Sequence, residues 1–143
     1  MKLVKEMKVR ISSEIANLSD SGTPEGEVEK TVESAACYAH FSDSGVLISY
    51  MLRSDGGEIQ TDITVNSDEV RVVRKGALSC DFRFREGEEH KSLYSVGPYS
   101  FDAAVSSEKQ RCLMNPECVR AYVYYYMTIG GARKYVKMKI IAE

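Results

Sequence analysis

The residues of this chain best suited to chemistry form a polar set within segments that otherwise alternate between apolar and polar residues. Arg74 stands in the segment Val70–Gly76 at a position where the alternation calls for an apolar residue. A guanidinium is costly to bury unless its five N–H donors find partners, so it needs polar neighbours or a ligand. The polar residues expected on the same face are Thr61, His90, Ser92, Tyr94 and Tyr125.

These six residues predict a binding site for a small amphipathic or anionic ligand. Arg74 would hold an anionic head group, while Val72, Phe82 and Phe84 would hold an apolar body. The alternative is a structural arginine at the end of a barrel, which extends to water or bonds to carbonyl groups and closes the core. The position of Arg74 one residue before a turn favours this alternative.

A second group of residues, the Tyr/Lys stripe, is expected on the outer face of a C-terminal hairpin. Its members are Tyr122, Tyr124, Tyr126, Tyr135, Lys137 and Lys139. Tyr–Tyr and Tyr–Lys neighbours stabilise a sheet through cross-strand contacts. The same stripe is also typical of a protein interface or homodimer, and aromatic rings among cations can stack bases and follow phosphates. These three interpretations stay open at this point.

The sequence predicts no catalytic site. It contains no nucleophile elbow, no phosphate-binding glycine loop and no HExxH zinc motif. His90 and Ser92 could form an acid–base pair, but no carboxylate can be placed to orient them. We therefore expect a protein that is not an enzyme and that needs no cofactor and no metal.

The four cysteines are expected to be free thiols. They are Cys37, Cys80, Cys112 and Cys118. Their spacing is not that of the short pairs found in zinc sites, and a reducing compartment keeps thiols reduced. Cys112 and Cys118 bracket an expected turn, so a bond or a shared metal between these two is the alternative.

The elements that must position these residues are β-strands. Apolar and polar residues alternate with a period of two in segments such as Met7–Ile15, Ile59–Val65 and Leu78–Phe84. Turn residues separate the segments at hairpin spacing, with no room for crossover helices, and the polar segment Ser19–Gly26 is expected to be a loop. The sequence predicts an all-β fold of about eight to ten antiparallel strands in one domain, residues 1–143. An up-and-down barrel is the simplest closure, and a two-sheet sandwich is the alternative.

Strand registers follow from matching the character of facing residues. A turn at Gly130-Gly131 pairs Tyr126 with Tyr135, and a loop at 66–69 pairs Thr61 with Arg74. A three-residue loop at 75–77 would pair Arg74 with Leu78. A loop at 85–89 would pair three further couples, Phe84 with His90, Phe82 with Ser92 and Cys80 with Tyr94. Each register keeps one continuous apolar face.

The charge balance and the apolar pattern limit the kinds of partner that can be expected. The chain has 143 residues, with 19 Lys and Arg against 21 Asp and Glu, and a formal net charge of −2. A nucleic-acid partner is therefore not expected, since domains that bind nucleic acid are usually strongly basic. Neither a secretory signal nor a membrane-spanning segment is evident, which predicts a soluble cytoplasmic protein without a membrane partner. A small-molecule ligand and a homodimer are the partners that we expect.

Short motifs along the chain resemble a known group of bacterial proteins. They are Val70–Gly76, Phe84–Gly87, Val123–Met127 and Met138–Ile140. On these motifs the chain is similar to the YwiB-like family, which has no established function. The family's pattern falls on Val70, Val72, Arg74, Gly76, Gly87, Tyr94 and Tyr125. The segment Val96–Phe101 departs from the Tyr-Gly that the family tends to show there. The resemblance implies a calycin-like, lipocalin-type β-barrel and no particular activity.

Overall fold

Period-two alternation becomes ten strands in the structure, a computed structural model that describes residues 2–143. The strands are β1 (Leu3–Leu18), β2 (Pro24–Ser42), β3 (Gly45–Ser54), β4 (Gly57–Val65), β5 (Val70–Gly76), β6 (Leu78–Phe84), β7 (Glu89–Val96), β8 (Tyr99–Asn115), β9 (Cys118–Ile129) and β10 (Ala132–Ala142). The all-β prediction is confirmed. The predicted loop at 19–26 is shorter, because Pro24 and Gly26 already belong to β2.

The strands form one closed antiparallel barrel in which each strand pairs with its neighbours in sequence. The barrel closes where β1 pairs with β10, from Val9 opposite Ala142 to Leu18 opposite Arg133. Closure removes the free edges that an open sheet of this size would expose. The up-and-down barrel is therefore confirmed, and the two-sheet sandwich is wrong.

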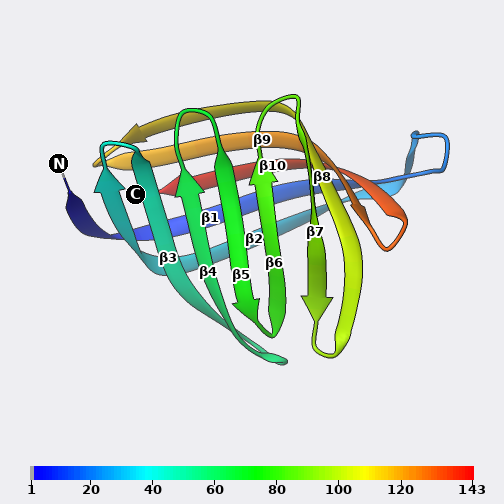
Figure 1. The fold of residues 1–143 in the computed structure, drawn as a ribbon, viewed down its shortest axis with the longest axis horizontal. Coiled ribbons are helices and arrows are strands. Elements are labelled where there is room, and N and C mark those ends of the chain that lie inside the picture. Colours follow the sequence, from blue (N-terminus) through cyan, green and yellow to red (C-terminus); the bar gives the residue numbers. More distant parts are fainter. Residues whose placement is uncertain (1) are drawn as a thin grey trace.

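Long and short strands give the barrel two unlike walls. In Figure 1 the short strands β3 to β6 cross steeply in front of the long strands β1, β2, β9 and β10. β2 pairs with β3 only from Tyr38 to Ser42, whereas it pairs with β1 along most of its length. The first part of β2 therefore extends beyond β3, and the side chains there are exposed except where they turn toward the barrel.

Two predicted registers are confirmed. In the last hairpin Tyr126 lies opposite Tyr135, and Val123 lies opposite Met138. Between β4 and β5, Thr61 lies opposite Arg74. A slip of one residue would move the lysines of β10 into the core, which explains why the apolar pattern is enough to set this register.

The predicted register between β5 and β6 is wrong by two residues, because Arg74 lies opposite Cys80 and not Leu78. The reason is that β5 continues along β4 as far as Gly76, which pairs with Ile59. Gly76 adopts a φ of +122°, and a Cβ atom at this position would collide with the carbonyl oxygen of Glu58. The shift is an even number, so every side chain stays on its predicted face.

The ladder between β6 and β7 is formed only at its start. Leu78 pairs with Val96 and Ser79 with Ser95, in the register that the sequence predicts. The predicted backbone pairs Phe84–His90, Phe82–Ser92 and Cys80–Tyr94 are not formed. In their place, the rings of Phe82 and Tyr94 stack with their centroids 6.3 Å apart.

The reason for this open ladder lies in the loop after β6, which bonds to β8. The Gly87 N–H donates to the Ser107 carbonyl at 2.8 Å, and the Ser107 N–H donates to the Glu88 carbonyl at 3.3 Å. Ser107 belongs to β8 beside a shift in register, so the loop is drawn past β7 to reach it. β6 and β7 therefore diverge after their first two pairs.

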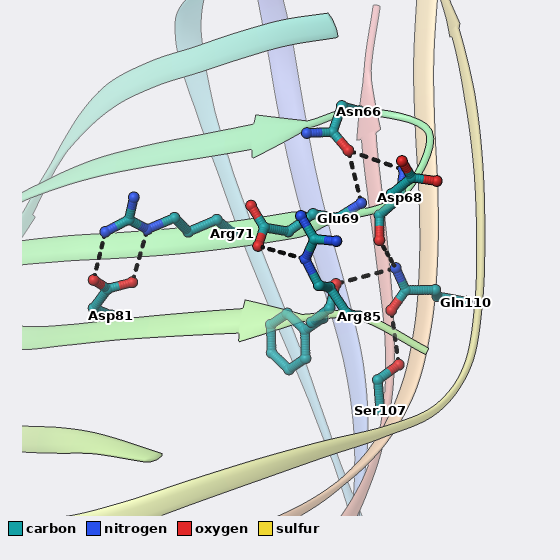
Figure 2. A network of polar contacts seen from close by, with 9 residues as sticks. Asn66, Asp68, Glu69, Arg71, Asp81, Arg85, Ser107 and Gln110 are labelled. Atoms are coloured by element: carbon teal, nitrogen blue, oxygen red, sulfur yellow. Dashed lines mark hydrogen bonds and ion pairs between the residues drawn. The ribbon is translucent and has the colours of Figure 1, made fainter. Parts of the chain in front are cut away.

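A polar network fastens this end of the barrel (Figure 2). Gln110 of β8 donates through Nε2 to the carbonyl groups of Phe84 at 3.1 Å and Asp68 at 3.3 Å. Its Oε1 accepts from the hydroxyl of Ser107 at 2.7 Å. Asn66 Oδ1 accepts two backbone N–H bonds of its own turn, at 2.7 and 2.9 Å. Side chains thus join β8 to the β4–β5 turn and to the end of β6.

The core fills the barrel interior with the alternating residues of all the strands. The largest fully buried side chains include Phe84, Ile48, Ile63 and Ile140, together with many valines. Thr61 and Ser107 are the buried polar residues among those that the structure describes. The interior is therefore mainly apolar, and the polar groups on its wall stand out.

Candidate functional site

The six residues predicted to bind a ligand all lie on the inner face of the barrel. Arg74, on β5, lies opposite Thr61 of β4, which is fully buried. His90, Ser92 and Tyr94 lie on β7, opposite Val105, Ala103 and Phe101 of β8. Tyr125, on β9, is buried against the ring of Phe84, with centroids 4.5 Å apart. The predicted face is confirmed for each of them, and ligand binding by them stays a prediction.

The partner of Arg74 is a residue that the sequence analysis missed, Glu33 of β2. Arg74 donates from Nη1 and Nη2 to the two carboxylate oxygens of Glu33, both at 3.1 Å. Its Nη1 also lies 3.5 Å from the hydroxyl oxygen of Thr61. The charge of this guanidinium is therefore balanced within the chain by a bidentate ion pair, and three of its five donors have partners.

Tyr50 of β3 completes this group by donating its hydroxyl to Glu33 Oε2 at 2.5 Å. We call Glu33, Tyr50, Thr61 and Arg74 the inner cluster. Its members come from four strands, and Glu33 reaches across from the part of β2 that does not pair with β3. The inner cluster therefore joins the two walls of the barrel where their backbones are not hydrogen-bonded to each other.

Burial and charge set the protonation states in the inner cluster. Burial and the hydrogen bond to Glu33 raise the pKa of Tyr50 well above its usual value, so the phenol keeps its proton. Burial works against the charge of Arg74, but its bonds and attraction to Glu33 outweigh this and raise the pKa of the guanidinium. The side chains of Arg74 and Glu33 are 17% and 27% exposed, so the pair sits at the margin of the core.

Glu33 could have been found from the sequence by extending the alternation along β2. It lies opposite the buried Ile11, and two residues before Ala35 and four before Cys37 on the same face. The segment Pro24–Ala36 is rich in glutamate and lacks the apolar rhythm of the other strands, which hid its strand character. The length of β2 follows from its pairing with β1, a tertiary contact that single-segment patterns do not carry.

Beside the inner cluster, the inner wall carries thiol and phenol groups whose pKa values are raised, so these groups stay uncharged. Burial raises the pKa of the Cys80 thiol to about 11. Burial likewise raises the pKa values of Tyr94 and Tyr125. No hydrogen bond joins either tyrosine hydroxyl to Arg74 within residues 2–143. Ser92 Oγ is buried and has no hydrogen-bond partner in the described chain. These residues therefore line the wall without forming one connected polar site.

The Tyr/Lys stripe lies on the outer face, as predicted. Lys137 Nζ lies 5.5 Å from the ring centroid of Tyr124, and Lys139 Nζ lies 5.6 Å from that of Tyr122. The rings of Tyr126 and Tyr135 pack with centroids 4.8 Å apart. The cross-strand pairing that the sequence predicted is therefore present.

The neighbouring strand β8 adds cations on the other side of the same tyrosines. Lys109 lies opposite Tyr124, and Arg111 lies opposite Tyr122, so each ring has a cation on both flanks. We call the following residues the basic-aromatic face: Lys109, Arg111, Tyr122, Tyr124, Lys137 and Lys139. Among residues 2–143 none of its four cations forms an ion pair with a carboxylate.

Two surface depressions flank the tyrosines of the basic-aromatic face. One, of about 520 Å³, lies over β8, β9 and the loop after β6, and its lining includes Lys109, Arg111 and the carboxylate of Glu86. The other, of about 370 Å³, lies over β9, β10, β1 and β2 and includes Lys137 and Lys139. Tyr122 and Tyr124 contribute to both, so they form a ridge between two hollows.

The four cysteines lie on β2, β6, β8 and β9. All four are free thiols, and Cys37 and Cys80 are buried. Cys112 lies opposite the inward-facing Ala121, whereas Cys118 precedes the inward-facing Val119 and so lies on the outer side. Residues 2–143 contain no group of three or more His, Cys, Asp or Glu side chains that could hold a metal ion. They also contain no helix with the length and apolarity to cross a membrane.

Comparisons with known proteins place the chain in a family. In sequence it is 23% identical over 99 residues to the uncharacterised β-barrel protein YwiB of Bacillus subtilis strain 168, covering 69% of this chain and 70% of that protein. In fold it is similar to the crystal structure of the YwiB protein from Bacillus subtilis, with a TM-score of 0.79 at 22% identity, covering 98% of this chain and 94% of the other. The model of a domain of unknown function, DUF1934, matches residues 14–140. The chain therefore belongs to the DUF1934 family of YwiB-like β-barrel proteins, whose function is unknown.

Proposed function

We propose that this protein is a non-enzymatic binding protein that holds an anionic partner on the basic-aromatic face. One observation carries the proposal: Tyr122 and Tyr124 form a ridge whose two flanks are both lined by cations that lack carboxylate partners in the described chain. Cations that form no ion pair favour association with negative partners. The proposal requires no catalytic residue, cofactor or metal.

The total charge of the chain does not oppose this proposal. The net charge is −2 and the pI is about 5.8, so an evenly spread charge would repel anions only weakly at pH 7. The charges are nevertheless separated in space, since glutamates such as Glu25, Glu27 and Glu29 lie on β2 while lysines gather on β10. A local basic field can therefore act on a partner although the sum is slightly negative.

The experiment is retention on a heparin column at pH 7.5, where a protein of this pI should otherwise flow through. We expect wild-type protein to be retained, and a variant with Lys109→Gln, Arg111→Gln, Lys137→Gln and Lys139→Gln to flow through. The matched control is Lys75→Gln with Lys91→Gln, two exposed lysines on other strands, which should behave like wild type. Flow-through of the wild-type protein would overturn the proposal.

A homodimer through the same face is the rival use of these residues. Native mass spectrometry of the purified protein separates the two, because a homodimer has twice the mass of the single chain. A monomeric wild-type protein that is retained on heparin supports the anionic partner. A dimeric wild-type protein that is not retained on heparin would favour self-association.

The second candidate function is the binding of a small amphipathic or anionic ligand inside the barrel. Two observations favour it: the ladder between β6 and β7 is paired only at Leu78–Val96 and Ser79–Ser95, and the buried Ser92 Oγ has no partner among the described residues. The pairing of Arg74 with Glu33 removes the original reason for an anionic head group. A small molecule that co-purifies in native mass spectra would support this candidate, and a bare protein mass would count against it.

The location that we propose is the cytoplasm. The four free thiols agree with a reducing compartment, where disulfides are rare. Fractionation of cells that express the tagged protein tests this location.

A further inference from the structure

The basic-aromatic face is the centre of a larger ordered array of cations. On the outer side of the long strands, facing residues form three rows across β8, β9, β10, β1 and β2. The rows are Lys109, Tyr124, Lys137, Glu14 and Lys30; Arg111, Tyr122, Lys139, Ser12 and Val32; and Leu113, Arg120, Ile141, Arg10 and Ser34. Glu14 is the one carboxylate in these rows. The strands that carry them lie side by side in Figure 1.

The spacing of this array suits a linear polymer better than a small anion. Neighbouring strands lie about 4.8 Å apart, so the cations of β8 and β10 form two lines roughly 10 Å apart with the tyrosines between them. Along each line, residues two apart are separated by about 6.8 Å. A site for one small anion directs its donors toward a single point. Parallel lines of cations instead match charges that repeat along a chain.

The tyrosines indicate which kind of linear polyanion fits this face. An acidic polypeptide would need the cations alone, and would gain little from aromatic rings between them. A nucleic-acid strand has both repeating phosphates and flat bases, and bases stack on aromatic side chains while cations follow the backbone. The hollows of about 520 and 370 Å³ beside Tyr122 and Tyr124 provide space for bases next to the rings. Only single-stranded nucleic acid exposes the faces of its bases in this way.

We infer that the basic-aromatic face binds single-stranded nucleic acid, with phosphates along the lysines and arginines and bases against Tyr122 and Tyr124. This inference rests on the proposed function, and it names the class of the anionic partner. The sequence argued against such a partner through the total charge alone. The separation of charge between β2 and the outer rows of β8, β9 and β10 removes that reason.

The test is fluorescence anisotropy with labelled twelve-nucleotide oligouridine and oligothymidine at 50 and 200 mM salt. Four phosphate contacts predict a slope of about −2.8 in log affinity against log salt, which is a loss of about 50-fold between the two concentrations. The variant Lys137→Gln with Lys139→Gln should lose about half of this slope. The control Lys75→Gln with Lys91→Gln should keep the wild-type slope.

The aromatic contribution is tested separately from the charge. Tyr122→Leu with Tyr124→Leu should weaken binding at least ~10-fold at an unchanged salt slope, because base stacking contributes about 1–3 kcal/mol per base. Tyr122→Phe with Tyr124→Phe keeps the rings and should bind like wild type. The phenylalanine variant also covers the case in which the leucine variant does not fold, as judged by circular dichroism. Equal binding by folded leucine and phenylalanine variants would overturn the inference.

A competitor distinguishes failure of this inference from failure of the proposed function. Polyglutamate of similar length should compete at least ~10-fold more weakly than unlabelled oligouridine. Equal competition, with wild-type protein still retained on heparin, would keep an anionic partner and make it an acidic polypeptide. Absence of oligonucleotide binding together with flow-through on heparin would overturn both proposals.

Discussion

The inner cluster and the basic-aromatic face are both polar groups built on β-strands, but they satisfy their charges in opposite ways. In the inner cluster, Arg74 meets Glu33 through two bonds of 3.1 Å, and Glu33 also accepts from Tyr50. On the basic-aromatic face, cations lie beside aromatic rings and have no carboxylate partner in the described chain. Polar groups that complete one another stabilise a fold, whereas charges left without partners remain available to another molecule.

The difference shows that position on a strand is a poor guide to function unless the partners are known. Arg74 is the residue that breaks the apolar pattern, and it seemed to be the better candidate for binding. Its ion pair with Glu33 joins β5 to β2, two strands that share no backbone hydrogen bonds. The less conspicuous lysines of β10 have the stronger claim to bind a partner.

The largest effect that we expect comes from breaking the inner cluster. Glu33→Ala leaves the largely buried Arg74 without its counter-charge, and should lower the free energy of unfolding by about 2 kcal/mol. This is less than the ~3–5 kcal/mol typical of fully buried pairs, because both side chains are partly exposed. Urea denaturation measures the change, and retention on heparin should stay as in wild type.

An outer ion pair of similar geometry provides the control. Arg71 donates to Asp81 at 2.9 and 2.6 Å across β5 and β6, and both side chains are more than a third exposed. Asp81→Ala should therefore cost no more than ~1 kcal/mol. If Glu33→Ala costs no more than Asp81→Ala, the inner cluster does not hold the two walls of the barrel together, and its charges do not differ in this respect from those on the surface.

Most of the fold could be predicted from the sequence because it depends on local rules. Period-two alternation indicates strands, glycine-rich pairs indicate turns, and the lysines opposite Tyr122 and Tyr124 allow only one register of the last hairpin. The register between β5 and β6 could not be predicted in this way. It depends on how far β5 follows β4, and Gly76 allows two more residues of pairing than the turn pattern suggests.

Each candidate site could be predicted only in part, two of four residues in the inner cluster and four of six on the basic-aromatic face, for the same physical reason. Alternation correctly placed Arg74 and Thr61 on the inner face and Tyr124 on the outer face. Their partners Glu33 and Lys109 come from β2 and β8, whose positions are set by closure of the barrel and by a register shift in β8. Residue spacing can place Glu33 on the inner face, but it does not show that this part of β2 lies across from β5. It also does not show the register shift that places Lys109 opposite Tyr124.

Thiol reactivity provides a chemical measure of the difference between the inside and the outside. Cys80 lies opposite Arg74 on the inner wall, and its raised pKa of about 11 leaves ~100-fold less thiolate than a thiol at 9.0. Cys118 lies on the outer side at the start of β9. Iodoacetamide at pH 8, followed by peptide mass spectrometry, should label Cys118 first and Cys80 only on unfolding. Early labelling of Cys80 would mean that the inner wall opens at the β6–β7 ladder.

A smaller effect is expected at Tyr135, which borders the basic-aromatic face. Its hydroxyl donates to Glu108 at 2.9 Å, and partial burial together with this carboxylate raises its pKa to about 12. The native state therefore holds this proton more tightly than the unfolded state, so the stabilisation is full below pH 10.0 and is lost as the pH rises through about 12. Tyr135→Phe should cost about 0.5 kcal/mol at pH 8. Urea denaturation at pH 8 and pH 11 checks both the size and the sign, since a cost that grows with pH would contradict this assignment.

The smallest effect on stability is expected where the effect on binding is greatest. Lys137→Gln with Lys139→Gln removes two cation–ring contacts of 5.5 and 5.6 Å, but it also relieves repulsion from Lys109 and Arg111, the cations of β8 in the same rows. The two changes oppose each other, so the free energy of unfolding should change by less than about 0.5 kcal/mol. Urea denaturation measures this change beside the heparin assay. A loss above ~1 kcal/mol would assign these lysines to the stability of the hairpin, because residues that act on a partner should leave the isolated fold almost unchanged.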